Sequence, residues 1–244
     1  RRRGAHEDSR VHRDMKLVLF DIDGTLLRSD GAGKPAIHRA LLEVFGATGP
    51  ADYHFDGKTD RQIVRELMRL EGHGDEHIDA SMQRLLDRYV GYLREELAAS
   101  TGRARLLPGV RELLDALDDR REIILGLLTG NLEQGARAKL AAVGLEFGRF
   151  RIGAFGSDHE HRPELPAIAR TRTRGQLGID IRGEAMVVIG DTPADLTCGR
   201  SLGASAIGVA TGRYSVEQLL EHDPVAAFYD LLDTASVLKA IVEA

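Results

Sequence analysis

Short apolar runs that end at polar or turn-forming residues recur along the chain, and this pattern predicts buried β-strands. The first run covers Lys16 to Phe20 and ends at the carboxylate of Asp21. Four later runs follow the same pattern, at residues 122–128, 150–155, 185–190 and 206–210. Apolar positions with helical spacing lie between the runs. Strands that alternate with helices predict an α/β fold, in which helices cover both faces of a Rossmann-like parallel sheet.

One long segment, residues 31–102, has no strand pattern. Its apolar positions recur at helical intervals and predict three helices, at about residues 35–45, 59–70 and 77–98. We interpret residues 31–102 as an α-helical domain inserted into a core domain, which would comprise residues 15–30 and 103–244. The expected linkers are the glycine-rich residues 29–34 and the polar residues 100–105.

The first 14 residues are polar and have no apolar periodicity. They lack the apolar central region of a signal peptide, so we expect residues 1–14 to be a disordered leader. The single cysteine excludes an internal disulfide, and the net charge of −5 disfavours nucleic acid as a partner. No apolar run approaches the ~18 residues that a membrane helix needs. We therefore expect a cytoplasmic protein with no membrane partner.

Candidate chemistry begins where the first strand ends. In α/β sheets, ligands bind at the carboxyl ends of the strands, and Asp21 and Asp23 are placed there. Two carboxylates this close repel each other unless a cation or a proton neutralises them, and Mg²⁺ prefers oxygen ligands. The alternative for this pair taken alone is an Asx-type turn that closes the strand.

Three more predicted strand ends are followed by polar groups. Thr129 and Asn131 lie where a helix starts, and free amides at such a position attract phosphate. Arg162 supplies a cation after the next strand. Asp191 ends a later strand, and Asp195 follows in the first helical turn. Each has an ordinary alternative, namely a helix cap, a surface arginine or a helix-dipole partner. Their order and their shared chemistry favour one reaction.

These segments resemble the four motifs of the haloacid dehalogenase-like hydrolases. The motifs are AspIleAspGlyThr at 21–25, Thr129 with Asn131, Arg162, and GlyAspThrProAlaAsp at 190–195. The resemblance runs from Lys16 to about Gly212, and the helical insert resembles the type 1 cap of that family. The segments at 57–60 and 190–200 are similar to phosphoglycolate-phosphatase-like members.

The resemblance implies phosphoryl transfer through an aspartyl phosphate. Asp21 would be the nucleophile on phosphorus, and Asp23 would protonate the leaving oxygen and then activate water. Asp21, the backbone carbonyl of Asp23, and Asp191 would hold Mg²⁺. The substrate would be a small phosphorylated metabolite, similar to phosphoglycolate, and the protein a monomer or a homodimer.

The resemblance also assigns the groups that would bind the substrate. The transferring phosphoryl group would be held by Asp21, Thr129, Gly130, Asn131 and Arg162. The family usually has a lysine where this chain has Arg162, and arginine keeps the charge but changes its reach and geometry. Asp195 would orient its neighbours.

Lys58 is a candidate for recognising an anionic part of the substrate. It lies in the insert, on a loop between Asp56 and Asp60, close to a predicted helix start. The alternative is an ordinary surface lysine of the cap. Its neighbourhood, rather than its residue type, therefore has to decide between the two interpretations.

Other functions remain to be weighed against a phosphatase. A sugar-phosphate mutase of the same superfamily and a catalytically inactive regulatory or binding protein both stay open. Asp23 disfavours a dehalogenase, because that subgroup lacks the second acid of the first motif. A dinucleotide-binding module is disfavoured because no Gly-x-Gly-x-x-Gly pattern follows the first strand.

Overall fold

The computed structural model describes residues 15–99 and 103–244, so the predicted leader and residues 100–102 of the second linker lie outside the described residues. Its centre is a six-stranded sheet in which every strand pair is parallel, in the order β5-β4-β1-β6-β7-β8. The strands are β1 (Lys16–Phe20), β4 (Ile123–Thr129), β5 (Ile152–Phe155), β6 (Met186–Gly190), β7 (Ser205–Val209) and β8 (Ala226–Phe228). The predicted α/β fold class is confirmed.

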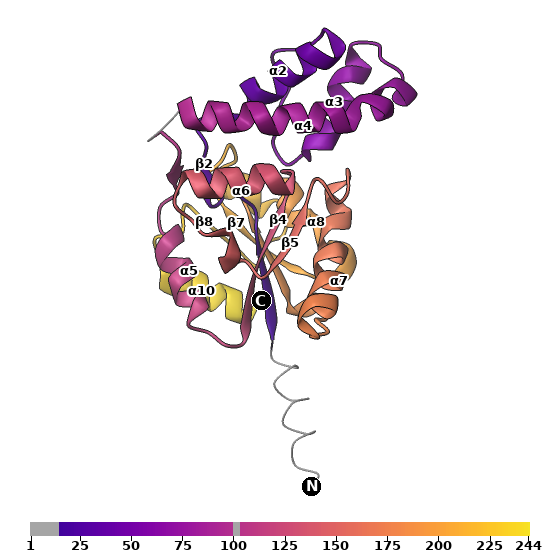
Figure 1. Cartoon of the computed structure of the whole chain (residues 1–244). Helices are drawn as coiled ribbons and strands as arrows, with labels where there is room; N and C mark the ends of the chain where they lie inside the picture. The colour runs from indigo at the N-terminus through magenta and orange to yellow at the C-terminus, as the bar shows by residue number, and fades with distance from the viewer. Residues whose placement is uncertain (1–14, 100–102) are drawn as a thin grey trace.

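Helices cover both faces of this sheet (Figure 1). One face packs against α5 (Val110–Asp118), α6 (Glu133–Ala142) and α10 (Thr234–Glu243). The other packs against α7 (Leu165–Leu177) and α8 (Pro193–Cys198), while α9 (Val216–Leu220) lies over β7 and β8. No helix in the described ranges combines the length and the apolar character that crossing a membrane requires.

The apolar composition of β1 follows from this two-sided cover. Val18 and Phe20 point into the cluster with α5 and α6, whereas Leu17 and Leu19 point into the cluster with α7. Successive side chains of a strand point to opposite faces, so a strand buried on both faces needs an unbroken apolar run. This run was the signal that predicted the strand.

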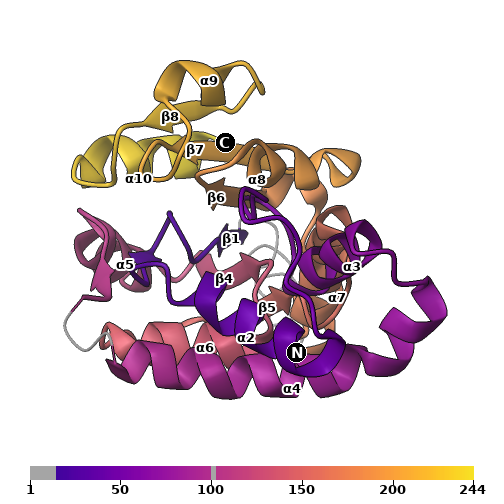
Figure 2. The same cartoon turned by 90° about the horizontal axis from the view of Figure 1, so that it is seen from above.

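Three helices of the insert lie over the carboxyl edge of the sheet (Figures 1 and 2). They are α2 (Gly33–Phe45), α3 (Asp60–Leu70) and α4 (Asp75–Ala99), close to the predicted ranges. They share an apolar cluster of their own, which Leu132 of the core joins. The connections to the core pair with each other as a short antiparallel ribbon, β2 (Leu27–Arg28) with β3 (Arg105–Leu106). The assignment of residues 31–102 as a separate domain stays a prediction.

Polar contacts hold the insert against the core near the ends of β4 and β5. The amide of Asp60 donates to the carbonyl of Gly130 at 2.8 Å, and a Cβ on Gly130 would overlap the carbonyl oxygen of Lys58. Arg65 Nε donates to Glu160 Oε1 at 2.6 Å, with both side chains largely buried. The insert is thus seated directly on the loops that carry the candidate chemistry.

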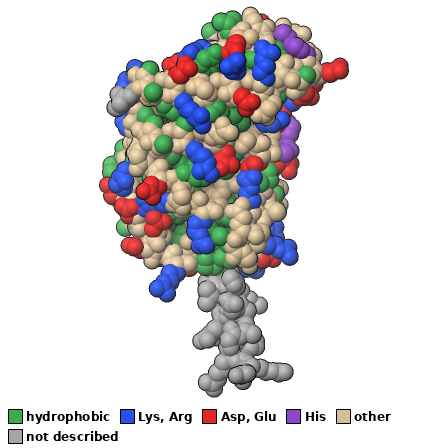
Figure 3. Space-filling model, in the orientation of Figure 1, with side chains coloured by type: hydrophobic (Ala, Val, Ile, Leu, Met, Phe, Trp, Pro, Cys, Tyr) green, Lys and Arg blue, Asp and Glu red, His purple; other side chains and the backbone are tan. Residues whose placement is uncertain are grey.

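Charged side chains of both signs are intermixed on the face of the molecule that Figure 3 shows. This distribution agrees with the small net charge of −5. The face drawn there offers no broad basic surface of the kind that nucleic-acid backbones favour.

Candidate active site

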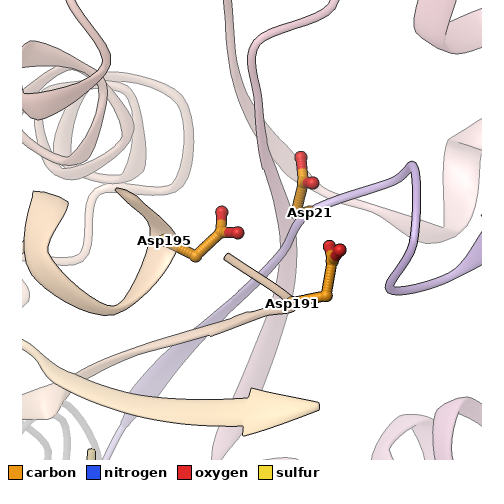
Figure 4. A group of neighbouring side chains, drawn as sticks. All are labelled: Asp21, Asp191 and Asp195. Atoms are coloured by element: carbon orange, nitrogen blue, oxygen red, sulfur yellow. The ribbon is translucent and has the colours of Figure 1, made fainter. Parts of the chain in front are cut away.

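Three aspartates meet at the carboxyl ends of β1 and β6. Asp21 follows β1, Asp191 follows the adjacent β6, and Asp195 lies in the first turn of α8 (Figure 4). A ligand oxygen of each lies within 4.8 Å of the others, and all three residues are buried. The pairing of β1 with β6, which continues as a hydrogen bond from the Asp21 amide to Ile189 O at 3.0 Å, fixes the first two side by side.

The carboxylate of Asp195 is fully occupied by protein donors. One oxygen accepts from Arg162 Nη2, and the other accepts from the amide and the hydroxyl of Thr192 at 3.0 and 2.7 Å. Thr192 and Asp195 also form a capping box at the start of α8. Asp195 therefore combines the two roles considered from the sequence, because it caps a helix and holds Arg162.

Asp21 and Asp191 keep coordination capacity that the protein does not use. Asp21 Oδ1 is buried and has no hydrogen-bond partner within the described part of the chain. Burial raises the pKa of Asp21 to about 6 despite the opposing charge of Arg162, and burial raises the pKa of Asp191 well above its usual value. Two buried carboxylates of this kind fit a hard divalent cation, which relieves their repulsion.

Two glycines let the backbone approach Asp191. A Cβ on Gly212 or on Gly24 would overlap the Asp191 carboxylate, and Gly24 has a φ of +81°, which favours glycine. Thr25 Oγ1 donates to Asp191 Oδ1 at 3.0 Å and fixes its orientation. The backbone at Gly24 and Gly212 therefore encloses the Asp191 carboxylate, and no residue larger than glycine fits at either position.

A cavity of about 210 Å³ lies between the insert and this edge of the sheet. Eight of the nine site residues predicted from the sequence line it, namely Asp21, Asp23, Lys58, Thr129, Gly130, Asn131, Arg162 and Asp191. The ninth, Asp195, lies beneath Arg162 and is fully buried. The structure thus brings residues from four separate core segments and from the insert to one place.

Arg162 occupies the position next to Asp21. It is 4% exposed, and its Nη2 lies 3.1 Å from Asp21 Oδ1 and 3.4 Å from the carbonyl of Leu128, besides its bond to Asp195. Burial by itself lowers the pKa of Arg162, but the charges of Asp195 and Asp21 raise it above the ordinary value. A surface arginine, the alternative considered from the sequence, does not describe this residue.

The loop after β4 holds its own side chains in place. Asn131 Nδ2 donates to Asp23 Oδ2 and to Thr129 Oγ1, both at 2.8 Å, and Thr129 is fully buried. Asn131 therefore acts on Asp23 as well as on the loop. This hydrogen bond joins side chains 108 residues apart in the sequence, and no local sequence pattern predicts it.

Lys58 lines the cavity, but its ammonium has partners within the insert. It donates to Tyr53 Oη at 2.7 Å and to Glu66 Oε2 at 2.5 Å, and its side chain is 29% exposed. An ammonium has three donors, so one remains for a ligand in the cavity. The position favours the interpretation as a ligand-facing lysine over that of a free surface lysine.

Two charged residues of the site were missed from the sequence. Lys139 of α6 is 5% exposed, and its Nζ donates to Asp23 Oδ2 and to Asn131 Oδ1, both at 2.6 Å. One sequence signal was available, because Lys139 lies three residues after Ala136 on the face of α6 that carries the apolar positions.

Asp60 is the second residue that the sequence did not reveal. It begins α3, where an acid ordinarily pairs with the helix dipole, yet it is 7% exposed. Its Oδ2 accepts from the amide of Leu132 at 2.8 Å, and Tyr89 Oη donates to its Oδ1 at 3.4 Å. Burial raises the pKa of Asp60 to about 6, against the lowering effects of Lys139 and of the Leu132 amide.

The comparisons with known proteins agree with this geometry. The family model described as haloacid dehalogenase-like hydrolase matches residues 18–200, three quarters of the chain. The chain therefore belongs to the haloacid dehalogenase-like hydrolase family, and the resemblance stated from the motifs is confirmed.

The sequence relatives include two bacterial proteins of similar length. The probable phosphatase IndB of Dickeya dadantii is 29% identical over 238 residues, covering 91% of this chain and 94% of that protein. A phosphoglycolate phosphatase of Rhodospirillum rubrum is 28% identical over 221 residues, covering 88% and 87% respectively. The likeness in both cases extends through the insert as well as the core.

Solved structures show the same fold. A hydrolase from Pseudomonas syringae superposes with a TM-score of 0.69 at 23% identity, covering 93% of this chain and 99% of that one. A predicted phosphoglycolate phosphatase from Haemophilus somnus superposes with a TM-score of 0.66 at 22% identity, covering 92% and 98%. At these identities the comparison speaks for the fold alone.

Asp60 should make the stability of the protein depend on pH. Its pKa of about 6 in the fold exceeds the ordinary 3.8, so the folded state holds the proton more tightly than the unfolded state. Its contribution is complete below pH 4 and is lost as the pH rises through about 6. Between pH 4 and pH 7, wild type should therefore lose about 2 kcal/mol of unfolding free energy relative to Asp60→Asn.

Urea denaturation of both proteins at a series of pH values measures this difference. Asp52→Asn, at an exposed position of the insert, is the control, and its unfolding free energy should change with pH as that of wild type does. If the unfolding free energies of wild type and Asp60→Asn changed with pH by the same amount, the prediction would be wrong.

Proposed function

We propose that this protein is a Mg²⁺-dependent phosphatase that hydrolyses a small phosphate monoester through an aspartyl-phosphate intermediate. The observation that carries the proposal is the buried pair Asp21 and Asp191, which share one cavity with the cation of Arg162, 3.1 Å from Asp21 Oδ1. Membership of the hydrolase family and the two sequence relatives named as phosphatases support it.

In the proposed reaction, a carboxylate oxygen of Asp21 attacks phosphorus and the bond from phosphorus to the ester oxygen breaks. The leaving oxygen takes a proton from Asp23. Asp23 then takes a proton from a water molecule as that water attacks the same phosphorus atom. The bond between phosphorus and Asp21 breaks, and inorganic phosphate and free Asp21 are formed.

The donor set of the site fits a magnesium ion. The carboxylates of Asp21 and Asp191 would hold it together with the backbone carbonyl of Asp23. Asp21 Oδ1, which accepts no hydrogen bond although it lies 3.1 Å from Arg162 Nη2, supports this assignment. When bound, the ion supplies positive charge to the phosphoryl oxygens. Asp195 is not proposed as a ligand, because protein donors already occupy both of its oxygens.

The remaining side chains of the site would position the phosphoryl group. The hydroxyl of Thr129, the amides of Gly130 and Asn131, and the guanidinium of Arg162 surround the space next to Asp21. Fixed donors of this kind stabilise charge in the transition state without the reorganisation that water needs.

The insert is proposed to act as the cap of this site. Its contacts through Asp60, Arg65 and Thr59 to the core lie beside the cavity, and closing them excludes water from the aspartyl phosphate. Opening of the same contacts would admit the substrate.

Hydrolysis of p-nitrophenyl phosphate should require both Mg²⁺ and Asp21. Removal of Mg²⁺ with a chelator should abolish turnover and addition of Mg²⁺ should restore it. Asp21→Asn removes the nucleophile while preserving the size of the side chain, so kcat should fall by about 10³-fold or more. Asp52→Asn, an exposed change, should leave kcat unaltered. Activity that survives Asp21→Asn would refute the proposed mechanism.

Arg162→Ala should lower kcat by about 10²- to 10³-fold, because it removes a fixed cation beside the phosphoryl group. Arg162→Lys keeps the charge and should recover part of the loss. Arg172→Ala, which removes an arginine that pairs with Asp158 outside the cavity, is the matched control. Thermal melting of each variant separates loss of catalysis from loss of folding. If Arg162→Ala is folded and its kcat lies within a few-fold of wild type, Arg162 does not have this role.

We infer a small anionic ester as the substrate, of which phosphoglycolate is the first candidate. A phosphoglycolate phosphatase is among the sequence relatives. Lys58, on the insert side of the cavity, has one donor left for a carboxylate.

Lys58→Met should raise KM for phosphoglycolate about tenfold, the cost of one charge-assisted hydrogen bond, with a smaller effect on kcat. KM for p-nitrophenyl phosphate, which has no carboxylate, should stay unchanged. Lys34→Met, at a lysine of the insert that donates to backbone carbonyls outside the cavity, should alter neither value. An unchanged KM for phosphoglycolate in Lys58→Met would remove Lys58 from substrate recognition.

A sugar-phosphate mutase is the alternative on the same fold. A structure from Thermotoga maritima, described as a candidate β-phosphoglucomutase, superposes with a TM-score of 0.60 at 24% identity. That likeness concerns the fold, whereas the sequence relatives are named as phosphatases. The hydrolase is therefore the function we propose.

A further inference from the structure

Lys139 is a buried lysine whose only described hydrogen-bond partners belong to the candidate active site. Its residue is 5% exposed, and its Nζ lies 2.6 Å from Asp23 Oδ2 and 2.6 Å from Asn131 Oδ1. Taking an ammonium out of water is costly unless it is paired and hydrogen-bonded, and these two acceptors meet that requirement.

The position of Lys139 in the fold does not itself call for a cation. The neighbouring buried positions of α6 are Gly135, Ala136 and Leu140, which need no polar partner. An apolar residue would fill the same place without the desolvation cost of a charge. The positive charge of Lys139 is therefore explained by the contacts of its Nζ with Asp23 and Asn131, and not by the packing of α6.

Lys139 and Asn131 act on the same oxygen of Asp23. Asp23 Oδ2 accepts from Lys139 Nζ at 2.6 Å and from Asn131 Nδ2 at 2.8 Å. Among the residues that the structure describes, Oδ1 accepts only from Ser29 Oγ, at the long distance of 3.3 Å. The Asp23 side chain is 39% exposed and lines the cavity. One oxygen is thus fixed by two donors, and the other is left to the cavity.

We propose that Lys139 is a positioning residue for proton transfer, which holds Asp23 by Oδ2 so that Oδ1 meets the ester oxygen of the substrate. The proposal rests on the proposed phosphatase function. The proton passes from Asp23 Oδ1 to the leaving oxygen as the bond from phosphorus to that oxygen breaks. Lys139 keeps its own proton and forms no bond to the substrate.

A positioning role has a signature that a structural role lacks, namely dependence on the leaving group. p-Nitrophenolate leaves as a stable anion, so its departure needs little help from an acid. An alkoxide is far more basic and needs the proton as the bond breaks. Since kcat/KM reports the steps up to the first phosphoryl transfer, comparing it for an aryl ester and an alkyl ester isolates the proton donor.

The test compares wild type with Lys139→Met, which keeps an unbranched side chain one atom shorter and removes the ammonium. Although burial opposes it, this ammonium holds the pKa of Asp23 below its usual value, so its loss alone would make Asp23 a readier proton donor and cannot cause the expected fall. The probes are p-nitrophenyl phosphate and the alkyl phosphate that wild type hydrolyses best among phosphoglycolate, glycerol phosphate and sugar phosphates. We expect kcat/KM for the alkyl ester to fall about 100-fold, within the range of general acid catalysis, and for the aryl ester to fall no more than about threefold.

Two further variants complete the design. Lys239→Met makes the same substitution at an exposed lysine of α10 and should change neither value. Lys139→Gln retains a hydrogen-bond donor for Asp23, so it should lie between wild type and Lys139→Met, and it replaces the latter if that variant does not fold.

Equal losses for the aryl and alkyl esters would overturn the proposal, and so would the absence of any loss. Failure of both Lys139 variants to fold would assign Lys139 to stability and would also overturn it. Failure of the phosphatase function itself has a different result, because then wild type is inactive or Asp21→Asn remains active.

Discussion

Negative charge buried at one edge of the sheet is the constraint on which the site depends. The pairing of β1 with β6 places Asp21 and Asp191 side by side, and burial raises the pKa of both carboxyls. The protein offsets only part of this charge, through Arg162, and leaves Asp21 Oδ1 without a hydrogen bond. A site built in this way favours a cation over an empty cavity, and the cation together with Arg162 would then favour an anionic phosphoryl group.

The guanidinium of Arg162, which faces Asp21, is itself held in place by the fold. Arg162 lies between Asp21 and Asp195, and Asp195 is fixed in turn by the capping box at the start of α8. A helix N-terminus thereby sets the position of a guanidinium on a different segment of the chain. The planar guanidinium of Arg162 contacts both carboxylates through Nη2, and a site with two carboxylates suits arginine, which presents several donors in a fixed plane.

The sequence predicted the parts of the molecule that have a local signature. Strands that are buried on both faces give apolar runs in the sequence. Asp21 and Asp191 directly follow such runs, Thr129 ends one, and Arg162 lies seven residues after the end of β5. The edge strand β8 was not predicted, although Ala226–Phe228 lies in a short apolar run, residues 225–229, that ends at Asp230; its three residues are only partly buried. Lys139 was missed for another reason, since its partner Asp23 lies 116 residues away and a helical lysine ordinarily faces solvent.

Contacts of the loop after β4 link the position of the insert to the orientation of Asp23. The amide of Leu132, which follows Asn131, donates to Asp60 of the insert, and Asn131 donates to Asp23. Moving the insert away would break the bond to Asp60 and expose the loop that orients Asp23. In the proposed mechanism, a substrate enclosed by the seated insert would therefore meet Asp23 in its fixed orientation, and the same contacts would exclude water.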